Sequence, residues 1–375
     1  MILADVNFEM IVTEAQLAPL LRLLNEQAPM VLAIDTEFVR TRTYYAQLGL
    51  LQIYDGQQCY LLDPLELDMA PLWQALARHH WVLHAFGEDL EIIQRLSGQF
   101  GLSVFDTQIG AAFLGHGISL GYQRFIATEL NIELDKGESR TDWLARPLRA
   151  SQLEYAALDV IYLLPAYLKI KQQLEEQGRY QAALEESARL ADLKKRVLNQ
   201  DTAYQDIKNA WKLSPQQLAV LKTLSAWRVQ QAMSRDLAIN NVVHADTLWA
   251  LARYQPSSMA QLQGLGLPAQ ELRIHGTRLL KLIKQAKQTK TADFPAPIKR
   301  IVDYPGYKKA IQELKKVVAT VAEESGLPED VLASKKMLNQ YLSWCWKENR
   351  QAEELPLLLT GWRQPLFANR VDQVA

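Results

Sequence analysis

The stretch Val31-Leu-Ala-Ile-Asp-Thr-Glu-Phe-Val-Arg40 predicts a buried strand that carries two acids at its end. Its first four residues are all apolar, which is typical of a strand covered on both faces. Asp35 and Glu37 follow with one residue between them, so in an extended chain their side chains point to the same side. Because unpaired buried carboxylates are unfavourable, a divalent cation with hard oxygen ligands would stabilise the pair. The alternative is a strand that runs out into solvent with two ordinary surface acids.

The length and composition of the chain are typical of a globular protein with several domains. It has 375 residues, of which 49% are hydrophobic and 22% charged, so extensive disorder is not expected. Its apolar runs are too short to span a bilayer, and the N-terminal residues show no secretory signal. The two cysteines, Cys59 and Cys345, lie far apart without metal-ligand spacing, which predicts reduced thiols in a cytoplasmic protein.

Charge is distributed unevenly along the chain. Residues 1–200 contain 17 Lys and Arg against 26 Asp and Glu, whereas residues 201–375 contain 24 against 16. A basic half joined to an acidic half suggests that the second half binds a polyanion such as nucleic acid. The alternative is that the basic helices are simply solvated faces.

Strands and helices alternate through the first 200 residues, which predicts an α/β layered domain with a mixed sheet. In chain order we expect a helix within 9–27 capped by Thr13, a hairpin of strands at 48–54 and 59–62, a helix at 72–79, a strand at 81–85, a helix at 86–96, a strand at 104–106, a helix at 107–114, a charged loop at 134–148 and a long helix at 152–177. Functional residues in such a sheet are expected at the ends of the central strands.

Three further residues of this domain have side chains suited to a polar site. Asp89 falls in the first turn of the helix at 86–96, where the helix dipole favours a carboxylate even without another role. Tyr155 and Asp159 are four residues apart on the helix at 152–177, so they lie one above the other on one face. Taken alone, this spacing also fits a core tyrosine beside an exposed aspartate.

The rest of the chain is predicted to be helical. A charged connecting helix at 181–202 precedes a first helical block at 214–288, in which Pro215 occupies the first helical position. A linker at 289–297 separates it from a second block at 304–362. The two blocks are candidates for diverged copies of one unit. We therefore expect three domains, at residues 1–200, 210–289 and 298–375.

Three motifs resemble those of the DEDD superfamily of 3′→5′ exonucleases, in the branch with a tyrosine in the third motif. They are Asp35-Thr-Glu37, the helix start Glu88-Asp89-Leu90 and Tyr155-Ala-Ala-Leu-Asp159. The surrounding sequence is similar to the ribonuclease D family, most clearly at 35–45, 84–91 and 139–148. The resemblance spans essentially the whole chain and implies an α/β ribonuclease H-like exonuclease domain with a mixed sheet.

The helical blocks also resemble known modules. The first is similar to an HRDC domain, the helical module shared by helicases and ribonuclease D, at Leu221-Lys-Thr-Leu-Ser-Ala-Trp-Arg228, Arg235-Asp236, Leu248-Trp-Ala-Leu-Ala252, Pro256 and His275-Gly276. The second is similar to a more divergent copy, at Leu332-Ala-Ser-Lys-Lys336 and Trp344-Cys-Trp346. The resemblance therefore implies two all-α HRDC-type domains after the exonuclease domain.

The resemblance further implies a metal-dependent nuclease site. Four acids would hold two divalent ions, Mg²⁺ or Mn²⁺: Asp35, Glu37, Asp89 and Asp159. Asp35 would bridge both ions, and Glu37 would also contact the terminal 3′-OH. Two ions about 3.5–4 Å apart can clamp the attacking and leaving oxygens of phosphodiester hydrolysis. Tyr155 would orient the attacking water, since a phenol with a pKa of about 10 is a poor base at neutral pH.

The same resemblance implies a cytoplasmic 3′→5′ exoribonuclease that releases nucleoside 5′-monophosphates. Its expected partners are tRNA precursors and other small structured RNAs; no membrane is involved, and a monomer is favoured. Candidate RNA contacts are Thr36, Phe38, His84, Lys222, Arg228, Arg235 and Arg273. Basic residues would contact phosphates, and Phe38, Tyr44 or Phe86 would stack on bases unless they pack in the core.

Two other functions remain open from the sequence. The same acids would serve a DNA 3′→5′ exonuclease, which matched RNA and DNA substrates would distinguish. A nucleic-acid-binding adaptor with a decayed nuclease domain is the alternative from another class. The complete set of acids argues against the adaptor, because a decayed site would be expected to lose at least one of them.

Overall fold

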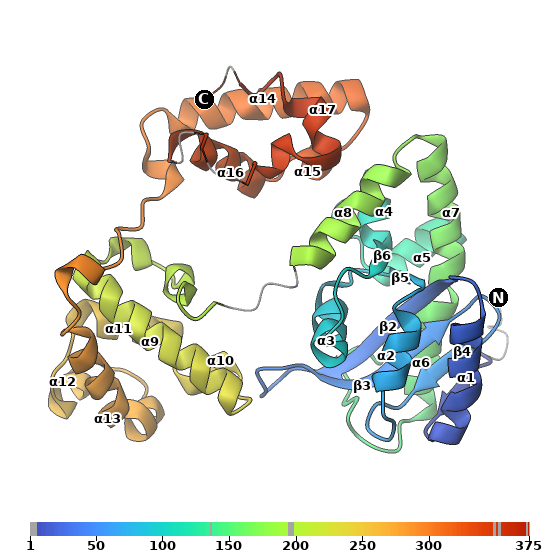
Figure 1. The fold of residues 1–375 in the computed structure, drawn as a ribbon, viewed down its shortest axis with the longest axis horizontal. Coiled ribbons are helices and arrows are strands. Elements are labelled where there is room, and N and C mark those ends of the chain that lie inside the picture. Colours follow the sequence, from blue (N-terminus) through green and yellow to red (C-terminus); the bar gives the residue numbers. More distant parts are fainter. Residues whose placement is uncertain are drawn as a thin grey trace. The chain divides into compact units, whose positions relative to one another are not determined.

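The computed structural model describes residues 6–135, 137–193, 199–347, 350–351, 354–372 and 374, and the chain divides into two compact units (Figure 1). The first unit comprises Met1–Val39, Gln47–Lys195 and Pro305–Ala375, and the second comprises Arg40–Ala46 and Arg196–Tyr304. The C-terminal helical block thus belongs to the same unit as the α/β domain. The division into three domains at 1–200, 210–289 and 298–375 remains a prediction.

The expected mixed sheet forms the centre of the first unit, with six strands instead of the five that the sequence predicts. The strands are β1 (Glu9–Ile11), β2 (Val31–Val39), β3 (Gln47–Tyr54), β4 (Cys59–Leu62), β5 (His80–Leu83) and β6 (Ser103–Asp106). They lie in the order β1-β4-β3-β2-β5-β6. The pairs β2–β3 and β3–β4 are antiparallel, whereas β1–β4, β2–β5 and β5–β6 are parallel. Strand β2 therefore lies inside the sheet with a partner on each side.

Strand β2 extends well beyond its apolar start. It continues through Asp35 and Glu37 to Val39 and pairs with β3 over this whole stretch, so the two acids do not mark a strand end in solvent. The register shifts between Glu37 and Phe38, which places a β-bulge directly after the second acid. Bulges bend a strand and redirect side chains, and they are frequent beside functional sites.

The expected helix within 9–27 begins directly after its predicted cap, and the residues before the cap form a strand. Residues Glu9–Ile11 form β1, which pairs in parallel with β4. Helix α1 (Glu14–Glu26) begins after Thr13, which forms a capping box with Gln16. The prediction of the Thr13 cap agrees with the structure, whereas the pairing of residues 9–11 with β4 was not expected from the sequence.

The long helix expected at 152–177 is two helices in the structure, α6 (Ala150–Ile161) and α7 (Leu163–Glu176). Pro165 explains the break. Its ring would clash with the carbonyl of Ile161 four residues earlier, and it has no N–H to donate. Helix α6 consequently ends at Ile161, shortly after Asp159.

The other helices of the α/β domain are α2 (Ala70–Leu76), α3 (Gly87–Ser97), α4 (Thr107–Phe113), α5 (Tyr122–Leu130) and α8 (Tyr180–Leu193). Helix α5 was not expected from the sequence. Helix α6 packs against β2, β3 and β4, whereas α7 packs against β2 and β5, and α8 against β6. This arrangement places α6 over the strand that carries the acids. None of the described helices combines the length and apolar character that crossing a membrane requires.

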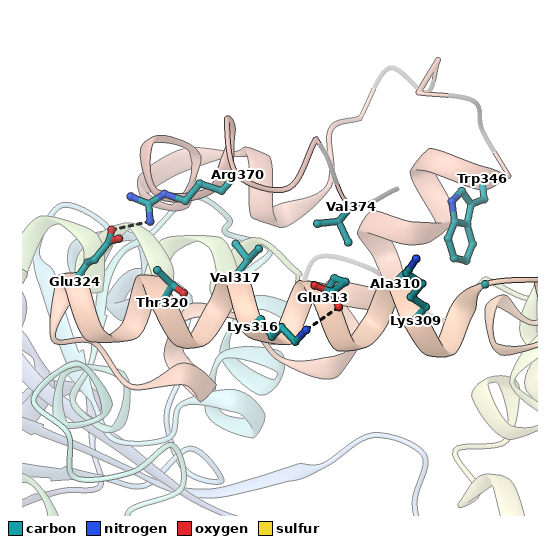
Figure 2. A pocket seen from close by; sticks show the side chains of 11 residues that line it. Lys309, Ala310, Glu313, Lys316, Val317, Thr320, Glu324, Trp346, Arg370 and Val374 are labelled. Atoms are coloured by element: carbon teal, nitrogen blue, oxygen red, sulfur yellow. Dashed lines mark hydrogen bonds and ion pairs between the residues drawn. The ribbon is translucent and has the colours of Figure 1, made fainter.

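The C-terminal block of the first unit contains α14 (Tyr307–Ser325), α15 (Glu329–Leu332), α16 (Lys335–Trp346) and α17 (Gln364–Phe367). A groove of about 820 Å³ runs along α14 (Figure 2). Four of its five charged side chains form pairs, Lys316 with Glu313 at 2.8 Å and Arg370 with Glu324 at 2.6 Å, and Lys309 is the fifth. These pairs leave little net charge in the groove to attract an anion.

A buried ion pair attaches this block to α8. Arg363 is 3% exposed, and its Nη1 lies 2.6 Å from Oε2 of Glu186 on α8. The remaining donors of Arg363 bind the carbonyls of Val331 and Leu332, each at 2.8 Å. The Nε1 of Trp362 donates to the same Glu186 oxygen at 3.2 Å. The C-terminal block is therefore fixed to the α/β domain through specific hydrogen bonds in its interior.

The second unit is helical and contains α9 (Pro215–Ser234), α10 (Ile239–Val242), α11 (Ala245–Tyr254), α12 (Met259–Gly264) and α13 (Ala269–Ala286). Helix α9 begins with Ser214 as N-cap and Pro215 at the first helical position, as predicted.

Residues 196–304 contain 15 Lys and Arg against 7 Asp and Glu, whereas 305–375 contain 10 against 9. The positive charge of the second half thus lies almost entirely in this unit. The predicted connecting helix at 181–202 includes a basic run at 194–196, and this run lies outside the described residues.

Candidate metal centre and active site

Strand β2 and helix α6 bring three carboxylates together. One oxygen from each of Asp35, Glu37 and Asp159 lies within 4.8 Å of the others. Asp35 and Glu37 share a face of β2 because they are two residues apart, and α6 packs against that strand. Residues far apart in the sequence therefore form one acidic group on the central strand.

Asp89 lies beside this group in the first turn of α3. It is 8% exposed, and its Oδ1 accepts a hydrogen bond from the hydroxyl of Thr36. It is close enough to Asp35 for its charge to raise the pKa of that carboxyl. The helix dipole alone would not require a buried acid at this position, so Asp89 belongs to the surroundings of the acidic group.

Asp106 holds the turn that precedes α3, a role that was not predicted from the sequence. Its carboxylate accepts hydrogen bonds from the backbone N–H groups of Ala85 and Gln108, both at 2.8 Å, and of Phe86 at 3.2 Å. Ala85 has a φ of 56°, a left-handed conformation that is uncommon for alanine. Asp106 stabilises this turn. It thereby determines where α3 begins and where Asp89, in the first turn of α3, lies. The available signal was an acid at the end of β6, beside the end of β5.

Tyr155 and Asp159 lie on the same face of α6, as their spacing predicts. The Tyr155 hydroxyl donates a hydrogen bond to the Asp159 carboxylate. The Tyr155 ring centroid lies 6.3 Å from that of the buried Trp143. Both Tyr155 and Asp159 are half-buried, so the alternative of a core tyrosine beside an exposed aspartate does not apply.

The charged loop before α6 is fastened to the sheet next to Tyr155. Arg146 forms a bidentate ion pair with Asp63 at 2.6 and 2.7 Å. It also donates to the carbonyls of Gly49 at 2.7 Å and Trp143 at 2.9 Å. A Cβ at Gly49 would lie 2.4 Å from the Trp143 carbonyl oxygen, so the close approach requires glycine there. This network holds Trp143 against Tyr155.

Burial raises the pKa of each acid in the site, and repulsion from the neighbouring acids adds to the effect at Asp35 and Glu37. Desolvation, followed by the charges of Asp89 and Asp159, raises the pKa of Asp35 well above its ordinary value. Desolvation and the charge of Asp159 raise the pKa of Glu37 to about 9. Burial raises the pKa of Asp89 to about 6 and that of Asp159 to about 7. Carboxylates this close together repel one another when they are all ionised. A bound cation relieves that repulsion, so such a group suits a metal site.

Several predicted RNA contacts are buried in the structure. Thr36 is buried and donates to Asp89. His84 is half-buried, stacks on Phe125 and lies 2.9 Å from both Thr107 Oγ1 and the Leu120 carbonyl oxygen, and desolvation lowers its pKa to about 4. Both side chains thus have partners within the domain, and their contact with RNA remains a prediction.

Arg228 and Phe86 are buried as well. Arg228 is 6% exposed and donates to the Ile239 carbonyl at 3.2 Å and to Asn240 at 2.7 Å. Phe86 is in the core. The accessible candidates are the exposed Arg235 and Arg273 and the half-buried Phe38, Tyr44 and Lys222.

Comparisons with known proteins agree with this fold. The family described as 3'-5' exonuclease matches residues 8–175, the HRDC domain matches 217–283, and the family described as ribonuclease D, C-terminal HRDC domain, matches 305–371. Ribonuclease D of Serratia proteamaculans (strain 568) is 43% identical over 98% of this chain and 99% of its own length. Ribonuclease D of Escherichia coli (strain K12) is also 43% identical, over 98% of each chain.

The fold is similar to that of a solved structure of the same kind. The crystal structure of Escherichia coli RNase D, described as an exoribonuclease involved in structured RNA processing, matches with a TM-score of 0.92 and 42% identity over 98% of each chain. The sheet, the acidic group and the family matches define a 3′–5′ exonuclease, a class that depends on divalent metal ions. The chain belongs to the ribonuclease D family and is an exoribonuclease.

Proposed function

We propose that this protein is a metal-dependent 3′→5′ exoribonuclease that releases nucleoside 5′-monophosphates by a two-metal mechanism. The observation that supports this most directly is the grouping of Asp35, Glu37 and Asp159 within 4.8 Å, with Asp89 alongside. Buried carboxylate oxygens suit Mg²⁺ or Mn²⁺. When bound, the two ions would supply stabilisation of charge on the attacking and leaving oxygens.

The residues of the chain would have separate tasks in this reaction. Asp35, Glu37 and Asp159 would hold the ions together with the neighbouring Asp89. Glu37 would also contact the terminal 3′-OH of the RNA, which restricts attack to the chain end. Tyr155 would orient the attacking water through its hydroxyl, while its hydrogen bond to Asp159 fixes the ring. Desolvation raises the pKa of Tyr155 above its ordinary value, so the phenol stays protonated and orients water without acting as a base.

Replacing Tyr155 with Phe should lower kcat by about 10²-fold or more while leaving the Kd for Mn²⁺ within about threefold of wild type. The reason is that the substitution removes the hydroxyl but none of the carboxylates. Single-turnover digestion of a 5′-labelled RNA measures the first quantity, and calorimetric titration with Mn²⁺ measures the second. A variant with full turnover would remove Tyr155 from the mechanism.

We propose tRNA precursors and other small structured RNAs as the substrates, acted on by a cytoplasmic monomer. The similarity to an exoribonuclease described as involved in structured RNA processing supports this substrate class. Both cysteines are buried and unpaired, as a reducing compartment favours. The positive charge of the second unit would bind RNA phosphates and position the substrate.

Helix α13 offers the clearest basic face in that unit. Arg273, Lys281 and Lys284 are exposed at spacings that place them along one side of the helix. The double substitution Lys281→Glu and Lys284→Glu should weaken RNA affinity about tenfold and lower the slope of log K against log salt by about 2. Fluorescence anisotropy with a labelled hairpin RNA at several salt concentrations measures both. Lys335→Glu with Lys336→Glu is a matched control on the nearly neutral C-terminal block and should change affinity little; equal effects of the two double variants would contradict the role of α13.

Digestion of 3′- and 5′-labelled RNA with Mg²⁺, Mn²⁺ or EDTA tests the proposed reaction. Release of mononucleotides from the 3′ end only when metal is present is the expected result. Parallel digestion of a DNA oligonucleotide of the same sequence tests the alternative DNA exonuclease. Binding of RNA without digestion under any metal would favour the adaptor function.

A further inference from the structure

Gln52 is a buried polar side chain whose amide has no partner of its own. It lies on β3 and is 0% exposed. Neither its Oε1 nor its Nε2 makes a hydrogen bond with any of the described residues. Buried amides are rarely left unpaired, because the loss of hydration without a replacement hydrogen bond is unfavourable. Gln52 therefore calls for an explanation that packing alone does not provide.

The position of Gln52 in the sheet indicates which polar group its amide can reach. In the register of β2 with β3, Gln52 stands directly opposite Asp35, whereas on β4 its partner is the apolar Leu61. Residues directly opposite in antiparallel strands project to the same face, with Cβ atoms about 4.5–5.5 Å apart. The next positions on that face of β3 are Leu50 and Tyr54, which pair with Glu37 and Ala33. The acidic group is consequently the polar neighbour toward which the Gln52 amide can turn.

The chemistry of an amide suits this neighbour. The Nε2 of glutamine is a donor at any pH, and a carboxylate that ligates a metal needs a donor to fix its remaining lone pairs. Asp35 already accepts a hydrogen bond from the backbone N–H of Thr36. A second donor on the opposite strand would fix the orientation of the carboxylate without adding charge to an acidic site.

We propose that Gln52 is a positioning residue of the metal site, whose amide N–H donates to the Asp35 carboxylate when the site is loaded with metal. This inference rests on the proposed metal-dependent function. Keeping a buried amide that makes no hydrogen bond with the described residues would then represent stability given up for a preorganised ligand. Ligand-orienting partners of this kind typically change metal affinity or activity by 10–100-fold when removed.

The test is to replace Gln52 with Met, which keeps the length and volume of the side chain but removes the amide. We expect the metal-free variant to melt at a temperature equal to or higher than wild type, because an unpaired buried amide is gone. We also expect its Kd for Mn²⁺, measured by calorimetry, to rise by about 10–100-fold and its kcat at subsaturating metal to fall in parallel, with KM for RNA unchanged. If Gln52→Met does not fold, Gln52→Leu makes the same test with a different shape.

A matched control is Gln94→Met, which alters another buried glutamine with an unpaired Oε1, on α3, whose Nε2 donates to the Ala191 carbonyl. This control should keep wild-type metal affinity and turnover. Mn²⁺ affinity and kcat of Gln52→Met within twofold of wild type would overturn the proposal. Absence of metal-dependent digestion by the wild-type protein would instead refute the proposed function, and the calorimetric comparison would still decide whether Gln52 supports a metal site.

Discussion

Replacing Asp35 with Asn is expected to lower exonuclease activity by at least about 10³-fold, because Asp35 is the proposed bridging ligand at the centre of the acidic group. The substitution preserves the shape of the side chain and its place on β2, so the loss would reflect chemistry rather than folding. Digestion of 3′-labelled RNA in Mg²⁺ and in Mn²⁺ measures this effect. Calorimetric titration should show the loss of Mn²⁺ binding in the same protein.

The same substitution is expected to stabilise the metal-free protein. Burial and the neighbouring charges raise the pKa of Asp35 well above its ordinary value of 3.8, so the carboxyl ionises more readily in the unfolded chain than in the folded protein. A group of this kind destabilises the folded state progressively as pH rises above the unfolded pKa. Because Asn does not ionise, the Asp35→Asn protein should have the higher free energy of unfolding at pH 7, with a smaller difference near pH 4. Urea unfolding in EDTA at the two pH values measures this.

Glu154→Gln is the matched control, since Glu154 is an exposed acid on α6, the helix that carries Asp159. It should change neither activity nor the free energy of unfolding appreciably. If the Asp35→Asn protein were inactive but less stable than wild type at pH 7, this would contradict the claim that repulsion among the crowded carboxylates destabilises the folded protein. Retained activity would contradict the proposed ligand itself.

Local sequence patterns were sufficient to find the acids but not to show their surroundings. The apolar run before Asp35 predicted its strand, and the four-residue spacing predicted that Tyr155 and Asp159 share a face, as they do. These inferences depend only on strand and helix periodicity. The roles proposed for these residues in catalysis remain predictions.

What the sequence did not reveal depends on contacts between distant segments. The β1 pairing with β4 and the carboxylate of Asp106 on the turn at Ala85 join residues that no local pattern relates. Basic residues illustrate the same limit. Arg228 and Arg273 are indistinguishable as candidates in the sequence, yet one is buried in the second unit and the other is exposed. Pro165 is different, because the break that it causes in the helix at 152–177 follows from the sequence alone.

Replacing Arg363 with Met is expected to lower the free energy of unfolding by about 3–5 kcal/mol, because it leaves the carboxylate of Glu186 buried without its strongest partner at this interface. Arg189 remains 2.5 Å from the other oxygen of Glu186. Because this partner still compensates part of the charge, we expect a loss toward the lower end of that range. Chemical denaturation of the full-length protein measures the change. The second substitution Glu186→Leu in the same protein should recover part of the loss, since it removes the buried carboxylate that Arg363 no longer helps to neutralise.

The pair also predicts a pH dependence with a definite sign. Burial by itself would raise the pKa of Glu186, but hydrogen bonds from Arg189 and Arg363 outweigh it and lower the pKa to about 2. The stabilisation is therefore complete above the ordinary pKa of about 4.5 and is lost as pH falls toward 2. In Arg363→Met the pKa of Glu186 should rise, so the difference in stability between wild type and variant should shrink across this acidic range.

Lys316→Met provides the control, because Lys316 pairs with Glu313 on the exposed face of α14 and such pairs contribute little to stability. A large effect of Arg363→Met beside a small effect of Lys316→Met would mean that the C-terminal block is structurally part of the catalytic unit. Deleting residues 305–375 would then destabilise the α/β domain, and lost RNA binding in a truncated protein could not be assigned to missing phosphate contacts. If Arg363→Met changed stability no more than Lys316→Met, the ion pair would be dispensable, and truncation would be a valid test of RNA binding after all.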